Sequence, residues 1–154
     1  MVREQHMDKV LTPAEIRDII DRLYAQMNQH DIDACVAFYT QDAELQDPTF
    51  PNPVRGADHV RGGFTDWMTA FPDVKVTVVD VIVEGQKAAV EWAFEGTHSS
   101  KYLGVPASGK LFRTLTISHF HFRGGRISRD FSMFDATALQ QLQSLAEQAG
   151  KGQG

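Results

Sequence analysis

The stretch Thr114-Leu-Thr-Ile-Ser-His-Phe-His-Phe122 is followed by the pair Gly124-Gly125 and then by a second strand-like run toward Asp135. Alternation with a period of two is typical of a β-strand, and a glycine pair between two such runs is typical of a hairpin. Residues of matching parity share one face of a strand. We therefore expect one face of this hairpin to carry Leu115, Ile117, His119, His121, Ile127, Phe131, Met133 and Asp135.

Further strands are expected earlier in the chain. The run Ala43-Glu-Leu-Gln-Asp47 reads as a short strand that Pro48 ends, and a valine-rich run extends from Val74 to Val83. In the segment 88–95, Ala88, Val90, Trp92 and Phe94 alternate with more polar or smaller residues. This pattern predicts a half-buried antiparallel strand with Trp92 on its inner face.

Three helices are expected before most of the strands. Thr12-Pro13-Ala14-Glu15 combines a capping box with proline at the first helical position, and apolar residues then recur with helical spacing as far as Met27. Asp31 is expected to cap a shorter second helix, and the stripe from Val60 to Phe71 predicts a third. A last helix is expected to carry Leu139, Leu142 and Leu145.

This order of elements predicts an α+β fold, in which three N-terminal helices cover a curved, conical antiparallel or mixed sheet and a short helix ends the domain. A chain of 154 residues fits one domain, which we place at residues 12–148. Residues 1–11 and 149–154 are expected to be disordered tails. The open mouth of a cone favours a small-molecule site.

Composition excludes several classes of function. The net charge of −5 comes from interspersed charges, which disfavours nucleic acid as a partner. No apolar run approaches the length needed to span a bilayer, and the N-terminal residues lack a secretion signal, so a cytoplasmic protein is expected. The single cysteine, Cys35, shares a helical apolar stripe and is expected to be buried.

Four short motifs carry a family resemblance. They are Ala70-Phe-Pro-Asp73, Gly96-Thr97-His98, Leu103-Gly-Val-Pro-Ala-Ser-Gly109 and Gly125-Arg-Ile127. Together they resemble the SnoaL-like polyketide cyclases of the nuclear transport factor 2-like superfamily, which includes ketosteroid isomerase, over roughly residues 14–146. The resemblance implies the same conical, cystatin-like α+β barrel and a homodimer.

The resemblance also implies catalytic residues. Cyclases of this group use an aspartate near the end of the last strand as acid/base, helped by a Gln-x-His pair, and these positions match Asp135 and His119-x-His121 with histidine replacing glutamine. The base of ketosteroid isomerase matches Asp47. That enzyme's oxyanion tyrosine falls near Leu23, next to Tyr24, and its oxyanion aspartate falls near Ser118, so the isomerase set is incomplete.

We therefore expect a cofactor-free acid/base enzyme that cyclises or isomerises a hydrophobic carbonyl compound, with Asp135, His121 and His119 catalytic. No metal is required, and substrate contacts are expected from Tyr24, Asp47, Trp67, Trp92, His98 and Phe131. The alternatives are a non-catalytic small-molecule-binding module of the same fold and a purely structural dimerisation domain.

Three points stay open from the sequence. Asp135 also suits the N-cap of the last helix. A bulge between the strands would send Asp135 to the opposite face, and Asp130 would then be the pocket carboxylate. A metal site would need His98 or Asp135 as a third ligand beside the histidine pair.

Overall fold

The computed structural model describes residues 9–47 and 52–151. Its helices are α2 (Pro13–Asn28), α3 (Ile32–Val36), α4 (Ala57–Ala70) and α5 (Ala136–Lys151). Its strands are β1 (Tyr39–Gln46), β2 (Val54–Arg55), β3 (Lys75–Glu84), β4 (Lys87–Thr97), β5 (Leu111–Arg123) and β6 (Arg126–Phe134).

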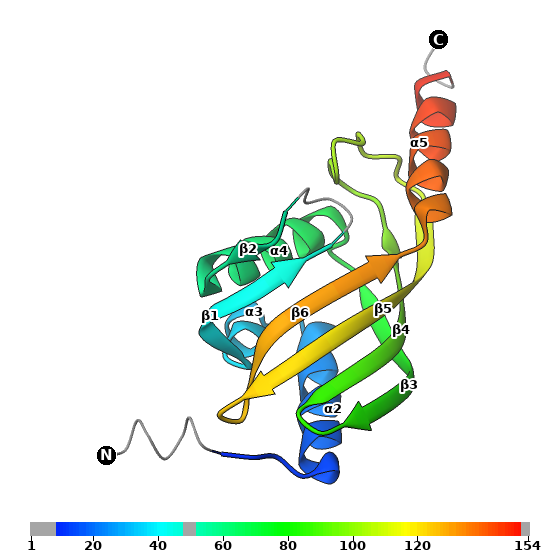
Figure 1. Cartoon of the computed structure of the whole chain (residues 1–154). Coiled ribbons are helices and arrows are strands. Elements are labelled where there is room, and N and C mark those ends of the chain that lie inside the picture. The colour runs from blue at the N-terminus through cyan, green and yellow to red at the C-terminus, as the bar shows by residue number, and fades with distance from the viewer. Residues whose placement is uncertain (1–8, 48–51, 152–154) are drawn as a thin grey trace.

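The strands form one curved sheet in the order β2-β1-β6-β5-β4-β3. β1 and β6 are parallel, and the other neighbours are antiparallel. Figure 1 shows α2, α3 and α4 on one side of the sheet, while α5 projects beyond its end beside the loop that joins β4 to β5. The predicted α+β fold with a curved mixed sheet is confirmed.

The first helix begins as the sequence predicts. Thr12 accepts a hydrogen bond from the Glu15 amide while the Glu15 carboxylate accepts one from the Thr12 amide. Of the two expected tails, residues 1–8 and 152–154 lie outside the described residues. Within the described part, Leu11 is buried and exchanges hydrogen bonds with the side chain of Gln86, and α5 continues to Lys151.

The pairing of β5 with β6 decides which side chains face the helices. His121 pairs with Arg129 but Phe122 pairs with Ile127, so Ser128 is an extra residue that forms a β-bulge. The side that faces the helices, here called the inner face, carries Thr116, Ser118, Phe120, Phe122, Ile127, Asp130, Ser132 and Phe134. The opposite side, the outer face, carries Leu115, Ile117, His119, His121, Arg129, Phe131 and Met133.

Two of the family motifs contact each other at the end of β4. Asp73 accepts hydrogen bonds from the Thr97 amide at 2.7 Å and from its hydroxyl at 2.6 Å. A Cβ added at Gly96 would lie 3.0 Å from Phe71 Cβ and 3.3 Å from Val74 Cα. Glycine is therefore required at residue 96 for close approach of the two segments.

We expect Gly96→Ala to lower the free energy of unfolding by about 1–3 kcal/mol, because Phe71 and Val74 must shift to admit the methyl group. Chemical denaturation measures this change. The matched control is Gly62→Ala in α4, where an added Cβ meets nothing within 4 Å. That change should stabilise the protein by about 0.5–1 kcal/mol. Equal effects at both positions would contradict the close-packing argument.

Candidate active site

A cavity lies between the inner face of the sheet and the helices α2 and α4, with α5 and the β4–β5 loop at its mouth. Its volume is about 160 Å³. Most of its wall is apolar or aromatic, which is typical of a small-molecule site. Among the described residues it is lined by Tyr24, Met27, Tyr39, Leu45, Gln46, Asp47, Val60, Gly63, Phe64, Trp67, Trp92, Phe94, Tyr102, Leu103, Phe112, Thr114, Thr116, Ser118, Phe120, Asp130, Ser132, Phe134 and Leu142.

Asp130 brings a carboxyl group into this apolar space from the middle of β6. The Tyr39 hydroxyl donates a hydrogen bond to Asp130 Oδ2 at 2.8 Å, and the Ser132 hydroxyl donates one to Oδ1 at 2.8 Å. Burial raises the pKa of Asp130, and the Asp47 carboxylate acts in the same direction, whereas the two hydrogen bonds oppose the rise. A carboxyl group in such surroundings is suited to both holding and releasing a proton.

A chain of hydrogen bonds leads from the sheet to this carboxyl group. Trp92 Nε1 donates to Ser118 Oγ at 2.9 Å, and Ser118 Oγ lies 2.7 Å from Ser132 Oγ. The indole can only donate, and the Ser132 hydrogen goes to Asp130 when the aspartate is ionised. The chain then runs in one direction, from Trp92 through Ser118 and Ser132 to Asp130.

Two further hydroxyl groups of the cavity wall have no hydrogen-bond partner within the described part of the chain: those of Tyr24 and Thr116. Both residues are almost fully buried, Tyr24 on α2 and Thr116 on β5. Burial and the Asp130 carboxylate raise the pKa of Tyr24, although the nearby Ser118 hydroxyl opposes this rise. Tyr24 therefore remains a neutral hydrogen-bond donor that faces the cavity.

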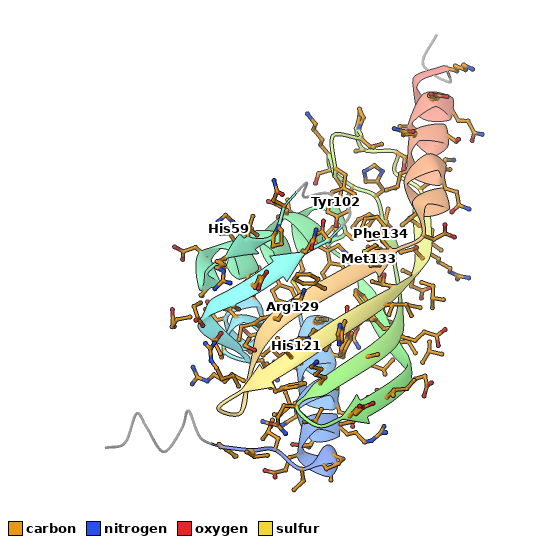
Figure 2. All side chains as sticks on the ribbon, viewed as in Figure 1. His59, Tyr102, His121, Arg129, Met133 and Phe134 are labelled. Carbon is orange, nitrogen blue, oxygen red and sulfur yellow. The ribbon has the colours of Figure 1, made fainter. Side chains whose placement is uncertain are left out.

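The predicted meeting of His119, His121 and Asp135 on the cavity wall is wrong. The two imidazoles lie on the outer face with ring centroids 4.9 Å apart, and His121 is labelled in Figure 2 on the side of the sheet away from the helices. Asp135 is exposed and directly precedes α5. The histidines lie on the outer face because Phe122, and not His121, pairs with the inner residue Ile127. The bulge at Ser128 accounts for the aspartate, because it brings Asp130 rather than Asp135 into the inner set.

The predicted substrate contacts divide into two groups. Tyr24, Asp47, Trp67 and Trp92 line the cavity. Phe131 does not, because it lies on the outer face, where the Arg129 guanidinium stacks 3.6 Å from its ring centroid.

His98 lies beside the cavity and not in its lining. Its Nδ1 accepts a hydrogen bond from the Ser108 amide at 3.2 Å, and its ring stacks on Phe71. Its backbone also closes the loop, through bonds with Lys110 and Gly109. Burial lowers the pKa of His98, while the nearby carbonyl oxygens of Val105 and Ser100 oppose this. His98 thus supports the loop that brings Tyr102 and Leu103 to the mouth.

The described residues do not form a metal centre. Within residues 9–47 and 52–151, no three histidine, cysteine, aspartate or glutamate side chains are grouped as metal ligands. The third ligand that the sequence suggested is not brought to the histidine pair, because His98 lies on the other side of the sheet. No helix of the described part is long and apolar enough to cross a membrane.

The residues that sequence reasoning underrated share a recognisable signal. Asp130 was only a fallback, and Ser118 and Ser132 received no role of their own, yet all three have the parity of Phe120 and Phe134. Aromatic residues on a strand are a better indicator of the buried face than histidines. The outer face misled the prediction because it also carries exposed Leu115, Ile117 and Met133.

Comparison with known proteins agrees with this fold. The family model of the SnoaL-like polyketide cyclases matches residues 17–142. TsrD from Streptomyces laurentii is 24% identical, with a TM-score of 0.77 over 88% of this chain and 98% of that one. IdmH from Streptomyces antibioticus, described as a candidate polyketide cyclase, is 25% identical, with a TM-score of 0.70 over 83% and 97%.

A protein with a ketosteroid isomerase-like fold from Catenulispora acidiphila, solved with trimethylamine, is 17% identical and has a TM-score of 0.69 over 89% of this chain and 98% of that one. The family match extends over most of the chain and includes α4, the cavity strands and Asp130. The protein belongs to the SnoaL-like polyketide cyclase family.

Proposed function

We propose that the protein is an acid/base catalyst that acts on a small, hydrophobic carbonyl compound, with Asp130 as the residue that removes and returns the proton. The observation that carries this proposal is the Asp130 carboxyl group, which faces an apolar cavity and receives hydrogen bonds from Tyr39 and Ser132. Family membership supports a cyclisation or an isomerisation, and both begin with removal of a proton next to a carbonyl group.

The hydrogen-bond chain suits a group that changes its protonation state. When Asp130 is ionised, Ser132 donates to it and Ser118 donates to Ser132. When Oδ1 carries the proton, Asp130 can donate to Ser132, and Ser132 can donate to Ser118. Only two hydroxyl hydrogens reorient between these states, so neither state leaves a buried acceptor on the chain without a donor.

The carbonyl oxygen of the substrate would lie against Tyr24 and Thr116. Their hydroxyl groups have no partner in the described part, and a neutral phenol is a suitable donor to an oxygen that gains negative charge. Asp47 lines the same cavity and places a second carboxylate in its wall. In this scheme the chain's own side chains perform every proton transfer.

We also propose a homodimer formed through the outer face. Several large apolar side chains there are exposed, including Ile117 at 44%, Leu115 at 46% and Met133 at 63%. They lie next to one another on β5 and β6, since Ile117 pairs with Met133. Contiguous exposed apolar surface of this kind favours burial against a second copy, as the family resemblance also implies.

We expect Asp130→Asn to slow proton exchange at the methyl group of acetophenone in D₂O by about 10²–10⁴-fold, because the amide cannot accept the proton. Mass spectrometry of the recovered ketone gives the rate. The matched control is Asp135→Asn, the same chemical change at the exposed aspartate, which should leave the rate near that of the unmodified protein. Exchange that is lost in Asp135→Asn but retained in Asp130→Asn would contradict the assignment of Asp130.

Tyr39→Phe should move the ionisation of Asp130 to higher pH. The Tyr39 hydrogen bond stabilises the carboxylate and so lowers the pKa of Asp130, and its removal lets burial dominate. The rising limb of the pH–rate profile for exchange should therefore shift upward. Tyr102→Phe, which alters a mouth tyrosine that has no hydrogen bond to Asp130, serves as the control. A shift to lower pH in Tyr39→Phe would refute this role.

Ile117→Lys should convert the dimer into a monomer, because it introduces a charge into the centre of the apolar outer face. Sedimentation velocity distinguishes the two states. Val10→Lys, at a valine that is 74% exposed and belongs to no strand, should leave the dimer intact. A monomeric unmodified protein, or a dimeric Ile117→Lys variant, would count against this interface.

A further inference from the structure

The wall of the cavity carries acidic side chains and no basic ones. Among the described residues that line it, Asp47 and Asp130 are acidic, and none is a lysine, an arginine or a histidine. The remaining polar residues of this lining, which include Gln46 and Tyr102, have uncharged side chains. A ligand with a carboxylate or phosphate group would therefore meet like charge and no cation in the wall.

Basic residues near the lining in the sequence do not supply the missing positive charge. Arg55 Nη2 lies 3.6 Å from Glu44 Oε2, and Arg61 on α4 pairs with Asp33. Lys101 precedes a lining residue in the β4–β5 loop, but its own side chain is exposed and does not line the cavity. Residues 48–51 are Pro-Thr-Phe-Pro, so they contain no basic group.

The negative charge acts at more than one point of the cavity. Burial is the main reason that the pKa values of Asp130 and Tyr102 are raised, and the Asp47 carboxylate adds to both rises. The hydrogen-bond donors to Asp130 are the neutral hydroxyls of Tyr39 and Ser132, which do not cancel its charge. Asp47 therefore acts both on the proposed catalytic carboxyl group and on the tyrosine in the β4–β5 loop.

Much of the remaining wall consists of aromatic rings, whose faces attract cations. Trp67 contacts Trp92 and Phe94 edge to face, and all three rings line the cavity. Within the described part of the chain, the arginines that lie over aromatic rings use Phe38 and Phe131, neither of which is in the lining. Aromatic surface of this kind, beside a carboxylate, suits a ligand that brings its own positive charge.

The cavity also contains polar groups that need a ligand. Tyr24 Oη and Thr116 Oγ1 have no hydrogen-bond partner within residues 9–47 and 52–151, and each residue is only 3% exposed. A neutral ligand could satisfy these hydroxyls, but it would also displace water from Asp47 and Asp130 without compensating their charge. A ligand with a positively charged nitrogen would do both.

We propose that the substrate combines its carbonyl group with a positively charged nitrogen, and that the charged nitrogen binds among the aromatic rings near Asp47 while the carbonyl group lies at Asp130. The proposal rests on the proposed function in that it assigns a substrate class to the same cavity. It predicts that the sign of the charge selects the ligand. Compounds with carboxylate or phosphate groups are excluded.

The test compares three para-substituted acetophenones at about 0.15 M salt, where long-range charge effects are screened. They are 4-acetyl-N,N,N-trimethylanilinium, its neutral isostere 4′-tert-butylacetophenone and the anion 4-acetylbenzoate. Trp67 and Trp92 are the chain's two tryptophans and both line the cavity, so their indole N–H signals in a ¹H–¹⁵N NMR titration report occupancy. The cation should bind at least about tenfold more tightly than the neutral isostere, although apolar burial alone favours the isostere. The anion should bind at least about a hundredfold more weakly than the cation.

Asp47→Asn removes the charge with little change of shape. It should weaken the cation by about tenfold and change the neutral isostere by less than about twofold. The matched control is Asp58→Asn, the same change at an exposed aspartate of α4 outside the lining, which should leave both affinities unchanged. Tyr102→Leu keeps an apolar side chain but removes the aromatic face, and it should weaken the cation by about two- to fivefold relative to the isostere.

Two results would overturn the inference: a neutral isostere or an anion that binds the unmodified protein as tightly as the cation, or equal loss of cation binding in Asp58→Asn and Asp47→Asn. The first comparison needs no variant, so it holds even where a substitution prevents folding. Preference for the cation with unchanged proton exchange in Asp130→Asn would remove the acid/base role alone. Loss of exchange in Asp130→Asn without any preference for the cation would remove the present inference alone.

Discussion

The extra residue at Ser128 determines which carboxylate reaches the cavity. On the N-terminal side of the bulge, Ile127 faces the helices. Without the bulge, every second residue after Ile127, including Asp135, would face the helices too. With the bulge, Asp130, Ser132 and Phe134 take the inner face instead. β-Bulges often re-aim side chains next to active sites, and this one selects the set of groups that can meet a ligand.

A carboxyl group in an apolar cavity carries a cost in stability, because burial disfavours its charged form. The structure reduces this cost by surrounding Asp130 with donors from three strands: Tyr39 on β1, Ser132 on β6 and, through Ser132, Ser118 on β5. These donors also fix the orientation of the carboxyl group. The hydrogen bonds that stabilise the buried carboxylate therefore also leave one side of the carboxyl group directed at the cavity, where a substrate would have to meet it.

Much of the fold could be predicted because local signals agreed with one another: the capping box at Thr12, the helical stripes and the alternation from Ala88 to Phe94 all match the structure. The site could be predicted only in part. Parity relates residues within a strand but does not say which face is inside, and both faces of β5 carry apolar residues. The bulge has no clear signature in Arg126-Ile-Ser-Arg129, so the exchange of Asp135 for Asp130 depended on pairing geometry that a single sequence does not display.

The motifs that carry the family resemblance form the frame of the cavity, whereas the groups proposed for chemistry come from elsewhere. Asp73 binds Thr97, Gly96 allows Phe71 to approach, and His98 holds the loop that carries Tyr102. Tyr24, Thr116 and Asp130 belong to none of these motifs. A frame that is specified separately from the lining can keep its shape while the lining changes, so membership of the family predicts the cavity better than it predicts the substrate. The edge-to-face contact of Trp67 with Trp92 and the groups around Asp130 are then properties of this chain's own lining, and the substrate is better inferred from them than from the family motifs.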